Sequence, residues 1–137
     1  MTAAITRTEV SEMIDLISVE DVTLSMENKI ILERAARNSE YLWLGQIDGR
    51  PICFYGLIPP SLMSDTAYLW LYTTAEFKEH TFIFVRRSQL VIEEMLRLYP
   101  NIVGHGMVGA TQSHRWLKFL GAEFGEPQGP FLPFRIK

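Results

Sequence analysis

Residues 67–73, AYLWLYT, begin the part of the sequence that determines the fold. Their alternation and their content of Tyr, Trp and Leu predict a strand that is at least partly covered on both faces. The longest helical pattern follows at residues 77–99, and Pro100 stops it. Residues 102–108 predict a second, short strand. A strand, a helix and a strand in this order join parallel strands by a right-handed crossover, so we expect a mixed α/β sheet that is parallel at this point.

Shorter elements are expected on both sides of this central unit. Apolar spacing predicts helices at residues 8–17, 25–38 and 111–120, and strands at residues 41–47, 51–58, 122–124 and 131–136. Asp48-Gly49 predicts a tight hairpin between two of these strands, because a type I′ turn needs positive φ at both central residues. Gly121 is expected to end the last helix, since glycine accepts the left-handed conformation.

The composition predicts one folded domain over residues 1–137, because 47% of the residues are hydrophobic and 21% are charged. A single cysteine, Cys53, excludes an intramolecular disulfide, and with three histidines it leaves no cluster for structural zinc. No apolar run approaches the roughly 18 residues of a membrane span. The acidic N-terminal region also lacks a signal-peptide pattern. We therefore expect a soluble protein of a reducing compartment, with no membrane partner.

Charge is distributed unevenly along the chain. The net charge of −3 argues against a nucleic-acid partner bound through a positive surface. Residues 1–77 hold five Lys and Arg against eleven Asp and Glu, a net of −6, whereas residues 78–137 hold eight against five, a net of +3. This asymmetry is either ordinary surface variation or the mark of a small anionic ligand at the second half.

Several of these segments resemble one family. The hairpin at residues 46–52, the strand end at 71–74, the long helix after it and the run SHRWLKFLGA at 113–122 resemble the GNAT (Gcn5-related N-acetyltransferase) superfamily. From Tyr68 onward the chain further resembles short GNAT-like proteins of tailed phages, some of which are internal virion proteins. The resemblance implies a three-layer fold, in which a mixed central sheet is splayed between two parallel strands and flanked by helices.

The same resemblance implies a site for acetyl-CoA between the two parallel strands. In the family, backbone N–H groups at the start of the next helix hold the pyrophosphate through an Arg/Gln-x-x-Gly-x-Gly/Ala motif. Lys78 matches its basic position, while Thr81 and Ile83 stand where small residues are usual. The residues implied to bind the cofactor are Leu71, Tyr72, Thr73, Lys78, Glu79, His80, Thr81 and Phe82. The alternative interpretation of residues 78–82 is the start of an ordinary amphipathic helix.

The catalytic groups of the family are matched only in part. A tyrosine that often acts as the general acid falls at Leu117, and an asparagine that often opens the last helix falls at Ala110. His105 lies between two glycines on a predicted strand and is the candidate base, the alternative being a structural histidine. Tyr68, Trp70 and Tyr72 share one face of their strand, where they line a substrate pocket or the pantetheine channel, or else pack in the core.

Two functions from different classes stay open. The first is an acetyl-CoA-dependent N-acetyltransferase that acts on an amine of a small molecule or of a protein. The second is an inactive GNAT-fold scaffold that binds within a phage virion or to a host protein, which places the chain in the virion or the host cytoplasm. The C-terminal strand at residues 131–136 is a candidate dimer edge under either function.

Overall fold

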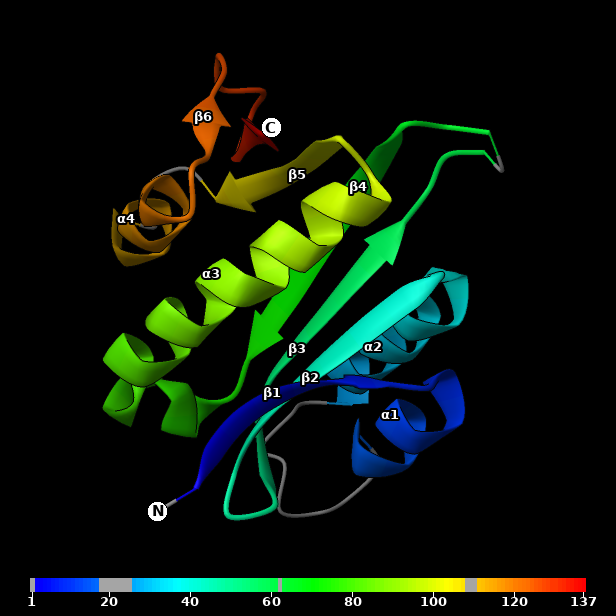
Figure 1. Cartoon of the computed structure of the whole chain (residues 1–137), viewed down its shortest axis with the longest axis vertical. Coiled ribbons are helices and arrows are strands. Elements are labelled where there is room, and N and C mark those ends of the chain that lie inside the picture. Colours follow the sequence, from blue (N-terminus) through cyan, green and yellow to red (C-terminus); the bar gives the residue numbers. More distant parts are fainter. Residues whose placement is uncertain (1, 18–25, 62, 108–110) are drawn as a thin grey trace.

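A seven-stranded sheet with the order β1-β2-β3-β4-β5-β7-β6 runs through the computed structural model, which describes residues 2–17, 26–61, 63–107 and 111–137 (Figure 1). In chain order the elements are β1 (Ala3–Thr8), α1 (Val10–Ile17), α2 (Met26–Asn38), β2 (Tyr41–Ile47), β3 (Arg50–Ile58), β4 (Thr66–Thr73), the 3-10 helix η1 (Ala75–Glu79), α3 (Thr81–Leu98), β5 (Asn101–Met107), α4 (Thr111–Phe119), β6 (Glu123–Phe124) and β7 (Phe131–Ile136). All neighbouring strands are antiparallel except β4 and β5, which are parallel as the central unit predicts.

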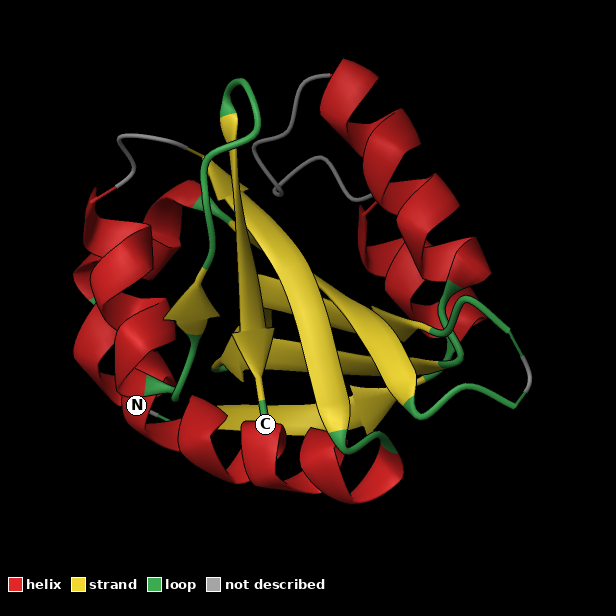
Figure 2. Cartoon of the chain, turned by 90° about the horizontal axis from the view of Figure 1, so that it is seen from above, coloured by secondary structure: helices red, strands yellow, loops and turns green. Residues whose placement is uncertain are grey.

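Helices cover both faces of the twisted sheet (Figure 2). On one face α3 buries an apolar stripe that includes Phe84, Val91 and Met95 against the strands. On the other face α1 and α2 pack over a separate cluster, which contains Met13 and Leu32. Each such fully buried side chain stabilises the fold by about 1.5–3 kcal/mol through the hydrophobic effect, which explains the strong apolar periodicity of the sequence.

The hairpin between β2 and β3 forms as the sequence predicts. Asp48 and Gly49 both have positive φ, at 48° and 82°, as a type I′ turn requires. The backbone N–H of Thr2 donates to the Asp48 carboxylate at 2.8 Å, so the turn is also tied to the N-terminal segment. The register shifts between Gly45 and Gln46, which places a bulge in the hairpin.

The two central strands separate partway along their length. β4 pairs with β5 at only three positions, of which the last joins Tyr68 to Val103. β4 continues to Thr73 with β3 still bonded on its other edge, while β5 continues to Met107 beside β7. Beyond Tyr68 the edge of β4 that faces β5 therefore has backbone groups outside its ladder with β5, which is the splayed geometry that the resemblance implies.

Two local predictions were wrong. The first element was expected to be a helix that begins at residue 8, but Ala3–Thr8 forms the edge strand β1 and α1 begins at Val10. Its short run of half-buried residues becomes a strand through pairing with β2. The helix expected from residue 77 begins at Thr81, because the φ of −131° at His80 interrupts it after η1. Across the described residues, no helix is both long and apolar enough to cross a membrane.

Candidate functional site

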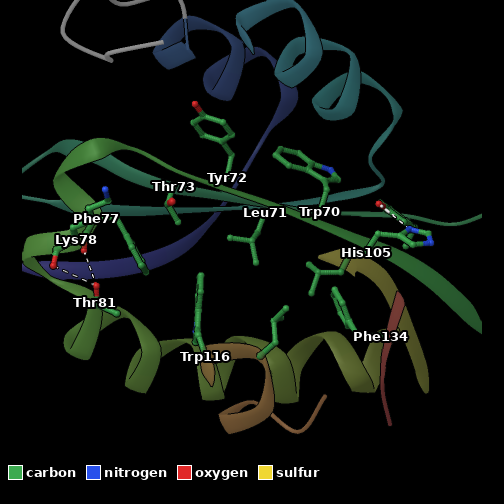
Figure 3. A pocket seen from close by; sticks show the side chains of 13 residues that line it. Trp70, Leu71, Tyr72, Thr73, Phe77, Lys78, Thr81, His105, Trp116 and Phe134 are labelled. Carbon is green, nitrogen blue, oxygen red and sulfur yellow. Dashed lines mark hydrogen bonds between the residues drawn. The ribbon is translucent and has the colours of Figure 1, made fainter. Parts of the chain in front are cut away.

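A cavity of about 510 Å³ lies where β4 and β5 separate. Its walls come from β4, η1, the first residue of α3, β5, α4 and β7 (Figure 3). Successive side chains of β4 leave the strand on opposite sides, so Trp70 and Tyr72 point toward α1 and α2 whereas Leu71 points toward α3 and α4. The cavity therefore reaches both faces of the sheet through the gap between the strands.

The middle of the cavity is apolar. Phe77 of η1 and Trp116 of α4 pack with ring centroids 5.1 Å apart, and Phe134 of β7 closes the wall beside them (Figure 3). The Nε1 atom of Trp116 is buried and has no hydrogen-bond acceptor within the described chain. A buried donor without an acceptor costs free energy, so a ligand oxygen is one way in which it would be satisfied.

The end of the cavity near α3 carries the features of an anion site. Lys78 is exposed and lines the cavity together with Thr81, the first residue of α3. The first turn of α3 contains no acidic side chain, and in the described chain its N-cap residue, His80, makes no side-chain capping bond. The N–H groups and the positive end of the helix dipole at this turn therefore favour an anion.

A salt bridge fixes η1 beside this end. Arg50, the first residue of β3, holds both carboxylate oxygens of Glu76, and His80 lies 3.5 Å from the same carboxylate. The hydrogen bond from Arg50 is the main reason that the pKa of Glu76 is lowered. The donor atoms of Glu76, Glu79 and His80 lie within 4.8 Å of one another. A metal would nevertheless have to displace Arg50, so this group favours an ion pair over a metal site.

The opposite end, on the side of α1 and α2, contains the candidate base. His105 is exposed on β5, and its Nδ1 lies 3.4 Å from the hydroxyl oxygen of Tyr68. The two rings are 5.7 Å apart between centroids and are tilted by 36°. The ring of Phe131 lies 6.2 Å from the ring of His105, again between centroids. Partial burial raises the pKa of Tyr68, so its hydroxyl keeps its proton. The ring of His105 is thus held at the mouth of the cavity with access to water.

The cavity brings together much of the set that the sequence predicts for cofactor, substrate and catalysis. The residues of that set that line it are Tyr68, Trp70, Leu71, Tyr72, Thr73, Lys78, Thr81 and His105. Glu79, His80 and Phe82 lie outside the lining. The backbone N–H of His80 donates to the carbonyl of Phe77, and Phe82 is 73% exposed beneath the guanidinium of Arg86. The roles of all these residues stay predictions.

Sequence reasoning did not place Phe77, Phe134 or Trp116 at the site. All three are buried, and their apolar character is equally typical of core residues. Leu117 lines the cavity at the position where the family resemblance puts a tyrosine, so the resemblance does locate α4 as part of the wall. No local sequence signal identifies the contribution of β7.

Comparison with known proteins gives matches among solved structures alone, since no family model and no curated protein matches the chain. A GNAT-family protein from Desulfovibrio desulfuricans is 11% identical over 99% of both chains, with a TM-score of 0.73. The PaiA N-acetyltransferase of Thermoplasma acidophilum, solved in complex with coenzyme A, is 15% identical over 100% of this chain and 99% of that chain, with a TM-score of 0.70. The spermidine/spermine N-acetyltransferase SpeG of Vibrio cholerae, solved in mutant forms, is 11% identical over 98% of this chain and 94% of that chain, with a TM-score of 0.64.

The chain has the GNAT fold. At this level of identity the similarity establishes the architecture and leaves activity to be argued from the site. The GNAT fold expected from the sequence, with a mixed sheet splayed between its two central parallel strands, is confirmed. The cavity described above occupies that splay.

Proposed function

We propose that the chain is an acetyl-CoA-dependent N-acetyltransferase that acts on an amine of a small molecule or of a protein. The observation that carries this proposal is the cavity between β4 and β5, which is lined by Lys78 beside the first turn of α3 and by His105 on β5. A donor with a phosphate-bearing tail and a reactive thioester head needs such a passage, because its two ends must be held on different parts of one sheet. The match to a protein solved with coenzyme A supports the same assignment.

The residues present fit acetyl-CoA with two departures from the phosphate-binding motif of the family. Lys78 and the first-turn N–H groups of α3 would hold the phosphates. Backbone groups of β4 beyond its ladder with β5 would accept hydrogen bonds from the amides of the pantetheine arm and donate to them. Trp116 would supply a donor for a carbonyl oxygen. The departures are Ile83 and Thr81, of which Thr81 stands where a glycine is usual. Its hydroxyl donates to the carbonyl of Phe77 at 3.2 Å, so it is turned back toward η1.

When bound, acetyl-CoA would supply an acetyl group activated as a thioester. The acceptor nitrogen forms a bond to the acetyl carbon, the carbon–sulfur bond breaks, and sulfur leaves with the electron pair as a thiolate. His105 accepts the proton that the nitrogen loses and passes it to water, which reaches its exposed ring. Leu117 has no proton to donate. The thiolate therefore departs without an acid at this position, which is tolerable for a leaving group whose thiol has a pKa of about 8.5.

A scaffold without transferase activity, in a phage virion or bound to a host protein, is the second candidate. The observation that favours it is the first turn of α3, where Thr81 and Ile83 replace small residues and Phe82 is 73% exposed with Arg86 over its ring. An exposed aromatic residue beside a cation is typical of protein contacts. The resemblance to phage proteins rests on the sequence from Tyr68 onward.

Calorimetric titration of the full chain with coenzyme A separates the two candidates. Binding should be detectable at or below millimolar ligand, and Lys78→Ala should weaken it by about tenfold through loss of a charged phosphate contact. Lys118→Ala is the matched control, because Lys118 is an exposed lysine of α4 outside the cavity. Failure of the wild-type chain to bind at millimolar ligand would reject the acetyltransferase and leave the scaffold.

A further inference from the structure

The end of the cavity on the side of α1 and α2 is built almost wholly from aromatic rings. Trp70 and Tyr72 come from one face of β4, and His105 comes from β5 (Figure 3). Strand alternation places Tyr68 on the same face of β4. We call these four residues the aromatic end. In an N-acetyltransferase with its donor at Lys78, the aromatic end is where the acceptor amine enters, because it lies across the sheet from the phosphates.

The indole of Trp70 is fixed and presents carbon to the cavity. Its Nε1 donates to the hydroxyl of Ser39 at 2.7 Å, so its one polar group is already used. Gly56 of β3 lies directly beneath the ring, and a side chain at that position would collide with the indole. The indole is thus held between β3 and the end of α2 as a flat, preorganised wall.

Tyr68 and His105 contact each other within the aromatic end. Their contact is both a tilted ring pair, with centroids 5.7 Å apart, and a polar approach of 3.4 Å between Nδ1 and the hydroxyl oxygen. The ring of Phe131 packs edge-on against that of His105, with an interplanar angle of 70°. The candidate base is therefore flanked by two rings, so a substrate nitrogen that reaches it brings the rest of its molecule against aromatic surfaces.

The charge of the lining restricts the acceptor further. Among the described residues that line the cavity, Lys78 is the one Lys, Arg, Asp or Glu side chain, and it lies at the donor end. The described part of the aromatic end thus offers no carboxylate to a second ammonium group. Against the described lining, a polyamine would bring additional positive charges to side chains that include no carboxylate, which is unfavourable because each charge loses water without gaining a partner there. A molecule with one amine and a flat apolar body meets no such cost.

We infer that the acceptor is a primary amine carried on an aromatic ring, of the arylalkylamine class. This inference rests on the proposed acetyltransferase function and adds the substrate class. The ring of the acceptor packs against Trp70 and Tyr68, and its amine reaches His105. Aromatic pairs prefer tilted and edge-on contacts of the kind already present among these residues, which makes the aromatic end selective for a ring over an alkyl chain of similar size.

Acetyl transfer to three amines tests the inference, once coenzyme A binding has been measured on the same preparation. The amines are 2-phenylethylamine, n-hexylamine and spermidine, and release of the free thiol of coenzyme A reports the reaction. We expect kcat/KM for phenylethylamine to exceed that for hexylamine by about fivefold and that for spermidine by at least about tenfold. Equal use of the three amines, or a preference for spermidine or hexylamine, overturns the inference while coenzyme A binding keeps the proposed function.

A variant pair tests the contribution of the rings. Tyr68→Leu should bring the ratio of phenylethylamine to hexylamine activity close to one, whatever it does to the absolute rate. Tyr41→Leu is the matched control, because Tyr41 is a half-buried strand tyrosine that packs on the other face of the sheet. An unchanged ratio in Tyr68→Leu overturns the inference, and if that variant does not fold, the wild-type ratios decide. Absence of coenzyme A binding rejects the proposed function, and the inference falls with it.

Discussion

Arg50 and Glu76 form a two-point ion pair that ties the β2–β3 hairpin to η1. The guanidinium Nη2 lies 2.7 Å from one carboxylate oxygen and Nε lies 3.1 Å from the other. The two residues are far apart in sequence, and their contact holds the segment that carries Lys78. The pair is solvent-exposed, so its importance lies in positioning the donor end of the cavity more than in overall stability.

We expect Arg50→Gln to weaken coenzyme A binding by a few fold, because η1 loses its anchor. Arg34→Gln changes an exposed arginine on α2; this variant is the matched control and should bind as the wild type does.

The ion pair between Arg50 and Glu76 also predicts a pH effect. The pKa of Glu76 is lowered in the folded state, so the pair contributes above the ordinary value of 4.5 and its contribution disappears as pH falls through the lowered pKa. Thermal midpoints of wild type and Arg50→Gln should therefore converge in acid, and convergence at neutral pH instead would contradict this account.

His105→Gln should lower kcat by about a hundredfold and leave coenzyme A affinity unchanged, since the imidazole is proposed to act on the acceptor. The loss should shrink as pH rises, because the amine then loses its proton to solvent without a protein base. Steady-state rates across a pH series, with calorimetry as the binding control, check both statements. A uniform loss at every pH would assign His105 to positioning and remove it as the base.

The Thr81→Gly variant examines one of the departures from the phosphate-binding motif. Removal of this side chain should let phosphate approach the first turn of α3 more closely and tighten coenzyme A binding by about threefold to tenfold. Glycine in a helix costs up to about 1 kcal/mol of stability. Gln89→Gly, at an exposed position of α3 beyond the first turn, should show that cost without the gain in affinity. Weaker binding in Thr81→Gly would show that the threonine contributes to the site.

Local sequence signals predicted those parts of the fold whose cause is local. The turn at Asp48-Gly49 follows from backbone sterics, and the apolar stripe of α3 follows from helical spacing around Phe84 and Met95. β1 was missed because its half-buried residues become a strand only when β2 supplies the partner edge. The break at His80 was missed because both η1 and α3 have helical patterns, and the interruption lies in one backbone angle.

The candidate site was predictable on β4 and η1 and less so elsewhere. Lys78 and Thr81 could be placed by the resemblance, since that motif follows directly on a strand. Trp116 and Phe134 reach the cavity from α4 and β7, which the chain brings there by long-range packing. Their sequence character is that of core residues, so only the assembled sheet distinguishes a cavity wall from a filled core.

A buried polar contact between β3 and α3 should contribute to stability. The hydroxyl of Ser88 donates to the carbonyl of Phe84 at 2.6 Å and so accepts from the hydroxyl of Tyr55, which lies 2.9 Å away. Ser88→Ala should lower the free energy of unfolding by about 1–3 kcal/mol, because the Tyr55 proton loses its acceptor. Urea titration measures this, and the double variant Ser88→Ala with Tyr55→Phe should recover part of the loss. Strict additivity of the two single changes would contradict a direct contact.

Gly104 keeps the cavity open, because it is the residue of β5 at which the two central strands begin to part. A Cβ at this position would lie 2.5 Å from the ring of Phe134 and 2.9 Å from the carbonyl oxygen of Leu69, and the backbone oxygen cannot move aside easily. Gly104→Ala should therefore lower stability by about 1–3 kcal/mol and push Phe134 toward the cavity, which weakens coenzyme A binding.

Gly125→Ala is the control for this change, because a Cβ there would meet Pro133 at 3.4 Å, an ordinary van der Waals contact. Calorimetry and urea unfolding on both variants separate the two effects. A stable Gly104→Ala protein that binds coenzyme A as tightly as the wild type would contradict the placement of the donor in the gap between β4 and β5. Loss of binding with little loss of stability would instead support that placement most directly, because the added methyl group acts on the cavity itself.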